Sequence, residues 1–192
     1  MRVELVDITD GAENLIAESA RTCYKSVAKD SSSNAKLVVH LRDSGHLSTF
    51  EHAKATFRIE GISRACSHQL VRHRHFSFSQ ESQRYVDEED FKYVTPDDVL
   101  RNANAREKYD SLMAEINSAY SFLLKEGVKK EDARFVLPNA CETTIVVTAN
   151  FRALREFIEL RKTEKAQWEI RELSARMLGI LREKAPNAFG DL

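Results

Sequence analysis

The length, composition and charge of the chain narrow the classes of protein it can belong to. It has 192 residues, of which 42% are hydrophobic and 31% charged, and its formal net charge is -1. These values are typical of one globular domain with a sizeable core. No apolar run reaches the roughly 18 residues of a membrane span, and a near-neutral molecule is not a whole-surface match for nucleic acid.

The start of the chain and its cysteines indicate where the protein works. Residues 1–7 contain no apolar stretch of the kind found in a signal peptide. The three cysteines, Cys23, Cys66 and Cys141, are odd in number and far apart. They therefore argue against a disulfide framework, and we expect a cytoplasmic protein.

The first elements follow from hydrophobic spacing. Residues 3–5 alternate as in a short strand, and apolar residues at helical spacing predict a helix over 12–23. The polar, serine-rich stretch 28–34 predicts a loop. A second helix around residues 37–41 is expected to end at Gly45 in a left-handed cap.

The middle of the chain alternates between a strand and less regular segments. Residues 53–59 alternate apolar and polar side chains, which predicts a half-buried strand closed by Gly61. Residues 62–71 are compatible with a helix. The acidic stretch 87–104 contains Pro96 and predicts a surface segment.

The last part of the chain is mostly helical. Residues 109–124 form the clearest amphipathic pattern, which Gly127 stops. The β-branched run 143–148 predicts a strand, and two helices are expected over 151–161 and 166–184. The class is therefore α+β, in one domain over residues 1–192.

The chemistry of the sequence concentrates in residues 72–85, which hold three arginines, two histidines, three serines and two glutamines. Such a segment cannot form a core, because each buried cation would need a partner. Composition alone leaves three interpretations: a solvated basic loop, a nucleic-acid contact with stacking by Phe76, Phe78 and Tyr85, or a pocket for a nucleotide-like small molecule.

The order of residues favours the third interpretation. Arg72-His73-Arg74 is followed after seven residues by Ser82, a motif that resembles the signature of flavin-dependent thymidylate synthases. Four further blocks are similar to blocks of that family and occur in the family's order: residues 44–52, Arg134-Phe135-Val136-Leu137-Pro138, Asn150-Phe151-Arg152, and Glu159-Leu160-Arg161.

The resemblance implies an enzyme that methylates dUMP to dTMP, with FAD as redox cofactor, methylenetetrahydrofolate as one-carbon donor and NADPH as reductant. It also implies a mixed, largely antiparallel sheet flanked by helices, and a homotetramer whose active sites combine residues of several subunits. Small molecules are the expected partners, with no nucleic acid, membrane or metal.

The resemblance also implies site residues. Arg161 matches the arginine beside the uracil ring and is the expected catalytic residue. Arg134 is expected to reach the phosphate from another subunit. The expected FAD contacts are Ser48, Arg72, His73, Arg74, Gln80, Asn150, Arg152 and Glu156. The expected dUMP contacts are Gln69, Arg72, Gln80, Ser82, Gln83, Arg84, Arg134 and Arg161.

Elementary chemistry agrees with the central roles. Arg84 and Arg134 suit the dianionic phosphate, because a guanidinium makes bidentate, charge-assisted hydrogen bonds. Arg161 suits the base, because a cation beside the imide stabilises the negative charge that develops when C5 reacts. The departures from the family's usual pattern are Glu156, where many members have His or Asn, and Lys165, where many have His.

Several residues invite other roles that we do not expect. His68, His73 and His75 lie close in sequence, but the flanking arginines would repel a metal cation. Ser82 has no visible acid–base partners for a nucleophile. Cys66 and Cys141 lack the Pro-Cys-His setting of thymidylate synthases that use a thiol, and are expected in the core. Trp168 is expected to pack on the last helix.

Overall fold

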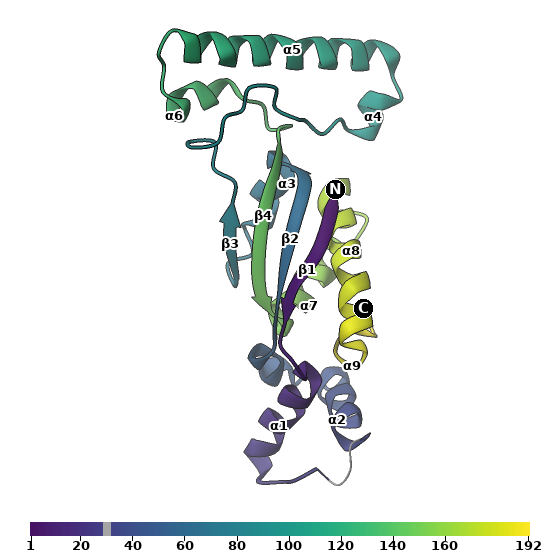
Figure 1. The fold of residues 1–192 in the computed structure, drawn as a ribbon. Helices are drawn as coiled ribbons and strands as arrows, with labels where there is room; N and C mark the ends of the chain where they lie inside the picture. The colour runs from purple at the N-terminus through teal and green to yellow at the C-terminus, as the bar shows by residue number, and fades with distance from the viewer. Residues whose placement is uncertain (29–31) are drawn as a thin grey trace. The chain divides into compact units, whose positions relative to one another are not determined.

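The structure is a computed structural model that describes residues 1–28 and 32–192, and it contains a four-stranded sheet in the order β1-β2-β4-β3 (Figure 1). Neighbouring strands run in opposite directions, so the α+β class is confirmed. A mixed, largely antiparallel sheet was expected, and the sheet is antiparallel throughout. The strands are β1 (Arg2–Ile8), β2 (Lys54–Ser63), β3 (Phe76–Gln80) and β4 (Glu142–Asn150).

The two central strands owe their place to alternating apolar residues. In β4 every second residue is buried, from Thr143 to Ala149. In β2 the buried positions are odd-numbered up to Ile59 and then shift to Ile62. Gly61 lies between them with a φ of 68°, so an extra residue in left-handed conformation changes the register. The strand therefore runs through Gly61, where the sequence predicted its end.

The chain divides into two compact units. The first consists of residues Met1–Ile59, Gln69–Ser79 and Val146–Leu192. The second consists of residues Glu60–His68 and Gln80–Ile145. All four boundaries fall inside elements of regular structure, because β2, β3, β4 and α3 (Arg64–Leu70) each supply residues to both units.

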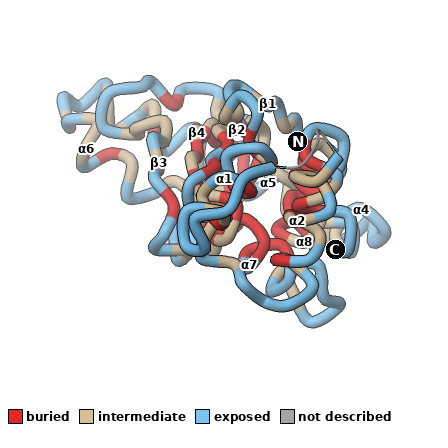
Figure 2. The backbone as a smooth tube through the Cα atoms, turned by 90° about the horizontal axis from the view of Figure 1, so that it is seen from below, coloured by how far each residue is buried: buried red, intermediate tan, exposed pale blue. Residues whose placement is uncertain are grey.

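In the first unit, α1 packs on α2, and α7 packs on η1 and α8. Each of α2, α7 and α8 contains buried residues, which appear as red stretches of the tube in Figure 2. An asparagine or glutamine starts two of the helices: Asn150 Oδ1 accepts from Ala153 N over 2.8 Å, and Gln167 caps the next helix. The elements are α1 (Ala12–Tyr24), α2 (Ser32–Asp43), η1 (Leu47–His52), α7 (Phe151–Arg161), α8 (Trp168–Lys184) and α9 (Pro186–Phe189).

A buried arginine ties α7 to the last residues of the chain. Arg155 is 3% exposed, and its Nη1 and Nη2 donate to the two carboxylate oxygens of Asp191 over 2.8 and 2.6 Å. It also donates to the carbonyl of Ala188. The Glu13 carboxylate accepts from the backbone N–H groups of Asn187 and Ala188 over 2.7 and 3.0 Å.

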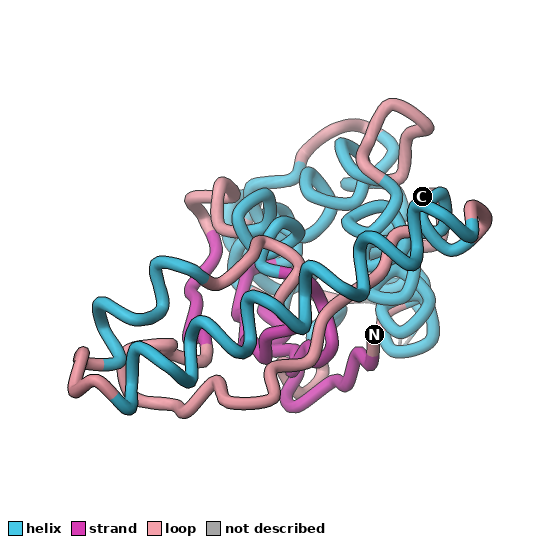
Figure 3. Tube along the Cα trace, turned by 90° about the horizontal axis from the view of Figure 1, so that it is seen from above, coloured by secondary structure: helices cyan, strands magenta, loops and turns pink. Residues whose placement is uncertain are grey.

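The second unit is built around the long helix α5, which Figure 3 shows unbroken along its length. Asn102 caps its start, so the helix begins before the predicted residue 109, and Gly127 follows its end with a φ of 81°. Met113 and Tyr120 are its buried residues. The helices wholly within this unit are α4 (Asp97–Leu100), α5 (Ala103–Lys125), α6 (Lys130–Ala133) and η2 (Arg134–Val136).

Three local predictions need correction. The predicted helix over 62–71 is shorter, because β2 extends to Ser63 and α3 ends at Leu70. The segment 76–80, treated as part of a polar motif, forms β3, in which Phe76 is buried and its neighbours are polar. Of the predicted loop 28–34, residues 32–34 lie in α2, and residues 29–31 lie outside the described residues.

The remaining predicted elements are present in the structure, each with the predicted type of secondary structure. The strands near 3–5 and 143–148 and the helices near 12–23, 37–41, 109–124, 151–161 and 166–184 are all present. The surface segment 87–104 contains the short helix α4. Within the described residues, no helix has the length and hydropathy needed to span a membrane.

Candidate functional site

The C-terminal end of α7 brings Arg161 against His73. Arg161 Nε donates to His73 Nε2 over 3.2 Å, so the imidazole accepts as a neutral ring. The ring is fixed from another side by Phe157, whose centroid lies 4.9 Å away at an interplanar angle of 90°. Burial lowers the pKa of His73, and the charge of Arg161 lowers it further. The bond occupies Nε of Arg161 and leaves its two Nη groups to meet a ligand.

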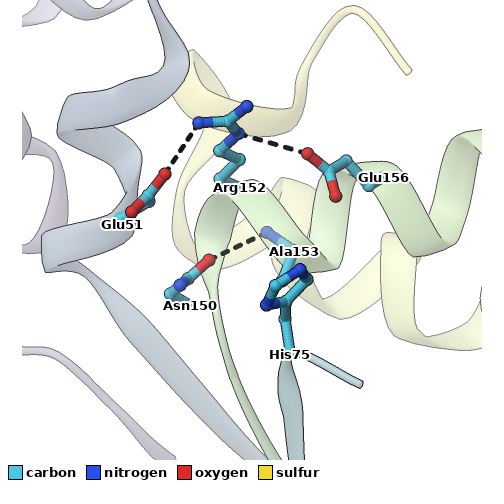
Figure 4. Close-up of a pocket in the computed structure, with 6 residues that line it drawn as sticks. All are labelled: Glu51, His75, Asn150, Arg152, Ala153 and Glu156. Carbon is cyan, nitrogen blue, oxygen red and sulfur yellow. Dashed lines mark hydrogen bonds and ion pairs between the residues drawn. The ribbon is translucent and has the colours of Figure 1, made fainter. Parts of the chain in front are cut away.

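The N-terminal end of α7 carries a second cluster, around Arg152. Arg152 Nη1 donates to Glu51 over 2.7 Å and its Nε donates to Glu156 over 3.1 Å (Figure 4). These hydrogen bonds raise the pKa of Arg152, the one to Glu51 most. A cavity of about 260 Å³ lies here, lined by Glu51, His75, Asn150, Arg152, Ala153 and Glu156.

The remaining predicted residues of the first unit lie on η1 and on the turn after α3. Ser48 is exposed on η1, the same short helix that carries Glu51. Arg72 and Arg74 are exposed in the turn. Gln69, just before them, makes a long hydrogen bond of 3.5 Å from its Nε2 to Gln167 Oε1.

In the second unit, Gln80 is held by two hydroxyl groups that the sequence did not indicate. Its Nε2 donates to Ser67 Oγ over 3.0 Å and to Thr143 Oγ1 over 3.2 Å. Both hydroxyl-bearing side chains are buried. Because the amide N–H groups are used in this way, Gln80 presents its Oε1 as an acceptor.

The two arginines predicted to bind phosphate meet at one residue of the second unit. Arg84 Nη2 donates to the Glu131 carboxylate over 3.1 Å, and Arg134 Nε donates to the Glu131 carbonyl over 3.1 Å. Ser82 Oγ accepts from Arg84 N over 3.3 Å, and Gln83 lies beside the carboxyl group of Glu88. The guanidinium of Arg84 also lies 5.5 Å from the centre of the Tyr85 ring.

A neighbouring cavity of the second unit does not suit a phosphate. It has a volume of about 320 Å³ and its charged lining residues are Lys92 and four glutamates. Burial and the nearby Glu81 raise the pKa of Glu88, one of the four. This cavity repels a dianion, so a phosphate fits better beside Arg84 and Arg134. The four glutamates are Glu60, Glu81, Glu88 and Glu142.

Comparison with known proteins identifies the family. Residues 4–187 match the family model described as thymidylate synthase complementing protein. The chain is 46% identical to a flavin-dependent thymidylate synthase of Geobacter sulfurreducens, over 100% of this chain and 86% of that protein. It is 43% identical to one of Nitratidesulfovibrio vulgaris, over 98% of this chain and 85% of that protein. The chain belongs to the flavin-dependent thymidylate synthases.

Membership favours one of the three interpretations of residues 72–85, the pocket for a nucleotide-like small molecule. A flavin-dependent thymidylate synthase is a flavoprotein and a methyltransferase of dTMP synthesis, so this segment belongs to a nucleotide-binding enzyme. The predicted residues fall into a group around His73 and Arg161, a group around Arg152, and a group around Gln80, Arg84 and Arg134. Each group lies within one unit.

The geometry gives the two buried cysteines, Cys66 and Cys141, no setting for nucleophilic chemistry. Cys66 and Cys141 are fully buried, and burial raises the pKa of the Cys141 thiol to about 12. A thiol in that state is a poor nucleophile, because the thiolate is the reactive form. Among residues 1–28 and 32–192, no group of three or more His, Cys, Asp or Glu side chains is placed to hold a metal ion.

Sequence reasoning missed four contributors to these groups. Glu51 and His75 line the cavity at Arg152, and Ser67 and Thr143 hold Gln80. Glu51 lies within the 44–52 block and His75 directly follows the Arg-His-Arg motif, so the sequence motifs already indicated the segments that contain both residues. Nothing in the sequence pairs Ser67 or Thr143 with Gln80, because that contact requires the fold.

Proposed function

We propose that the chain catalyses the reductive methylation of dUMP to dTMP, using FAD as redox cofactor, methylenetetrahydrofolate as one-carbon donor and NADPH as reductant. It does so as one functional domain over residues 1–192. The observation that carries the proposal is family membership across residues 4–187 together with the complete Arg72-His73-Arg74 to Ser82 motif.

FAD is held by residues at the start and in the first half of α7, on η1, on the turn after α3 and at the end of β3. Arg152 has N–H donors of the kind that bind a diphosphate, and Glu51 and Glu156 engage two of them when no ligand is bound. Bound FAD would supply the electron transfer, while the protein supplies orientation and electrostatics. The proposed FAD contacts are Ser48, Arg72, His73, Arg74, Gln80, Asn150, Arg152 and Glu156.

dUMP is bound through its phosphate and its imide. Arg84 and Arg134 take the phosphate, exchanging their contacts with Glu131 for charge-assisted bonds to the phosphate oxygens. The Nη groups of Arg161 stabilise the negative charge that develops on the base as C5 reacts. The proposed dUMP contacts are Gln69, Arg72, Gln80, Ser82, Gln83, Arg84, Arg134 and Arg161.

The chain acts as a homotetramer in which Arg134 completes the site of another subunit. Large apolar side chains support this proposal, because Phe135 is 82% exposed directly after Arg134 and Phe122 is 60% exposed on α5. An apolar surface of this kind is commonly covered by a partner.

The activity is tested with purified protein, dUMP, methylenetetrahydrofolate and NADPH, by following dTMP with chromatography. dTMP is expected only when all three substrates are present, and the protein should carry a flavin that absorbs near roughly 450 nm. A flavin-free protein that makes no dTMP after FAD is added would contradict the proposal.

A further inference from the structure

Arg152 is held between two carboxylates that come from different parts of the first unit. Glu156 lies one turn after Arg152 on α7, and Glu51 lies on η1, about a hundred residues earlier in the chain. The pairs measure 3.1 Å and 2.7 Å. In Figure 4 the guanidinium lies between the two carboxylates, so two of its five N–H donors are already engaged.

The charge of this cavity does not favour an anion while the pairs are in place. Its charged lining residues are Glu51, Glu156 and Arg152, which sum to a negative charge when His75 is neutral. Asn150 uses its Oδ1 to cap α7. A diphosphate that approaches therefore meets two carboxylates and one occupied guanidinium, and both effects weaken its binding.

We propose that Glu156, together with Glu51, sets the affinity for the diphosphate of FAD by competing for Arg152. The inference rests on the proposed function, which places the FAD diphosphate beside Arg152. Binding of FAD competes with these two pairs, because Arg152 offers all of its N–H donors to phosphate oxygens only when the carboxylates are released. The two glutamates are affinity-determining residues, and they keep FAD binding weaker than the arginine alone would allow.

The side chains are accessible enough for this exchange. Arg152, Glu51 and Glu156 are 43%, 48% and 53% exposed. Solvent-exposed ion pairs contribute little to stability, so breaking one costs little. Substitution of Glu156 should therefore leave the fold intact and change chiefly the competition for Arg152.

The test compares Glu156→Gln with the wild type by titrating each apo-protein with FAD and following flavin fluorescence. Glutamine keeps the size of the side chain and removes its charge. The dissociation constant for FAD should fall by about threefold to tenfold, the scale of removing one screened like charge near the ligand. Glu51→Gln, a second variant at an exposed position, should change it in the same direction.

Glu172→Gln is a matched control. Glu172 forms the same kind of exposed pair, with Arg176 four residues later on α8, and lies outside the cavity. Its substitution should leave the FAD dissociation constant unchanged. The inference is wrong if neither cavity variant binds FAD more tightly than this control. Weaker binding of FAD by both cavity variants would also contradict it, because that result would mean that the glutamates orient Arg152 for FAD.

The two proposals fail in different ways. Wild-type protein that binds FAD and makes dTMP, with no gain in the cavity variants, would remove only the role of the glutamates. Wild-type protein that binds no FAD at any concentration would remove the proposed function, and this inference with it.

Discussion

Arg161 donates from Nε to Nε2 of His73 over 3.2 Å, and this bond joins the end of α7 to the centre of the Arg-His-Arg motif. Arg161, which we propose as the catalytic residue, is held through Nε and not through its two terminal Nη groups. The bond requires a neutral imidazole, which burial and the nearby cation favour by lowering the pKa of His73. Arg161 and His73, which lie 88 residues apart in the sequence, therefore form one hydrogen-bonded pair.

Arg161→Ala should lower turnover by at least about 100-fold, the scale of losing one group that stabilises charge in the transition state. Single-turnover formation of dTMP measures the chemical step directly. Arg182→Ala, which removes an exposed arginine of α8, is the control and should keep wild-type turnover. Turnover of the Arg161 variant within a few-fold of wild type would exclude the catalytic role.

The His73 pair predicts a pH dependence of stability. The pKa of His73 is lower in the folded state than its ordinary value near 6.5, so below that value the unfolded chain binds more protons than the folded one. The free energy of unfolding therefore falls as the pH falls through this window. Denaturant unfolding at pH 7.5 and 5.5 should show a larger loss for wild type than for His73→Gln. His68→Gln, at an exposed position, should lose as much unfolding free energy as the wild type. Equal losses of unfolding free energy in all three proteins would disprove the assignment of this pH dependence to His73.

The Arg155–Asp191 pair predicts a large effect of one substitution near the C-terminus. Asp191→Asn removes the charge that partners a guanidinium 3% exposed, and an unpaired buried cation is costly. We expect a loss of about 1–3 kcal/mol, discounted because Asp191 itself is partly exposed. Denaturant midpoints measure it, with Asp97→Asn, at the exposed Asp97–Arg101 pair, as the control. A loss no larger than that of the control would show that the pair contributes little.

The buried cysteines should be dispensable for chemistry. The Cys66→Ala, Cys141→Ala double variant should form dTMP at a rate within about threefold of wild type, because neither fully buried thiol is a ready nucleophile. Some stability should be lost to the cavities left behind, on the order of 1 kcal/mol per site. A folded double variant with no dTMP formation would indicate a thiol mechanism.

The proposed tetramer predicts ligand-dependent stability and complementation. A ligand that bridges subunits stabilises the assembled state, so the melting temperature should rise with FAD and again with dUMP. Mixed Arg134→Ala and Arg161→Ala subunits should recover part of the activity, because some sites then receive both intact residues. A fully active monomer in sedimentation would refute the shared site, and the flavin chemistry would be unaffected.

The sequence by itself determined the family, the α+β class and the type of nearly every long element. Alternation of apolar residues was enough to predict β2 and β4, because both strands bury one face. The ordered motif blocks predicted Arg161, Arg152 and the Arg-His-Arg segment as site residues through the family resemblance, whereas the composition of residues 72–85 alone left three interpretations open.

Only the tertiary structure decided the partners of these residues. The bonds from Arg161 to His73, from Arg152 to Glu51, and from Gln80 to Thr143 join positions 88, 101 and 63 residues apart. Hydrophobic spacing indicates which face of an element is buried. It does not indicate which polar groups of different elements form hydrogen bonds with one another. The extension of β2 through Gly61 was missed because the backbone conformation of Gly61 decides it and leaves no regular apolar pattern. The strand β3 was missed although its phenylalanines and serines alternate, because it is only five residues long and lies within a polar segment.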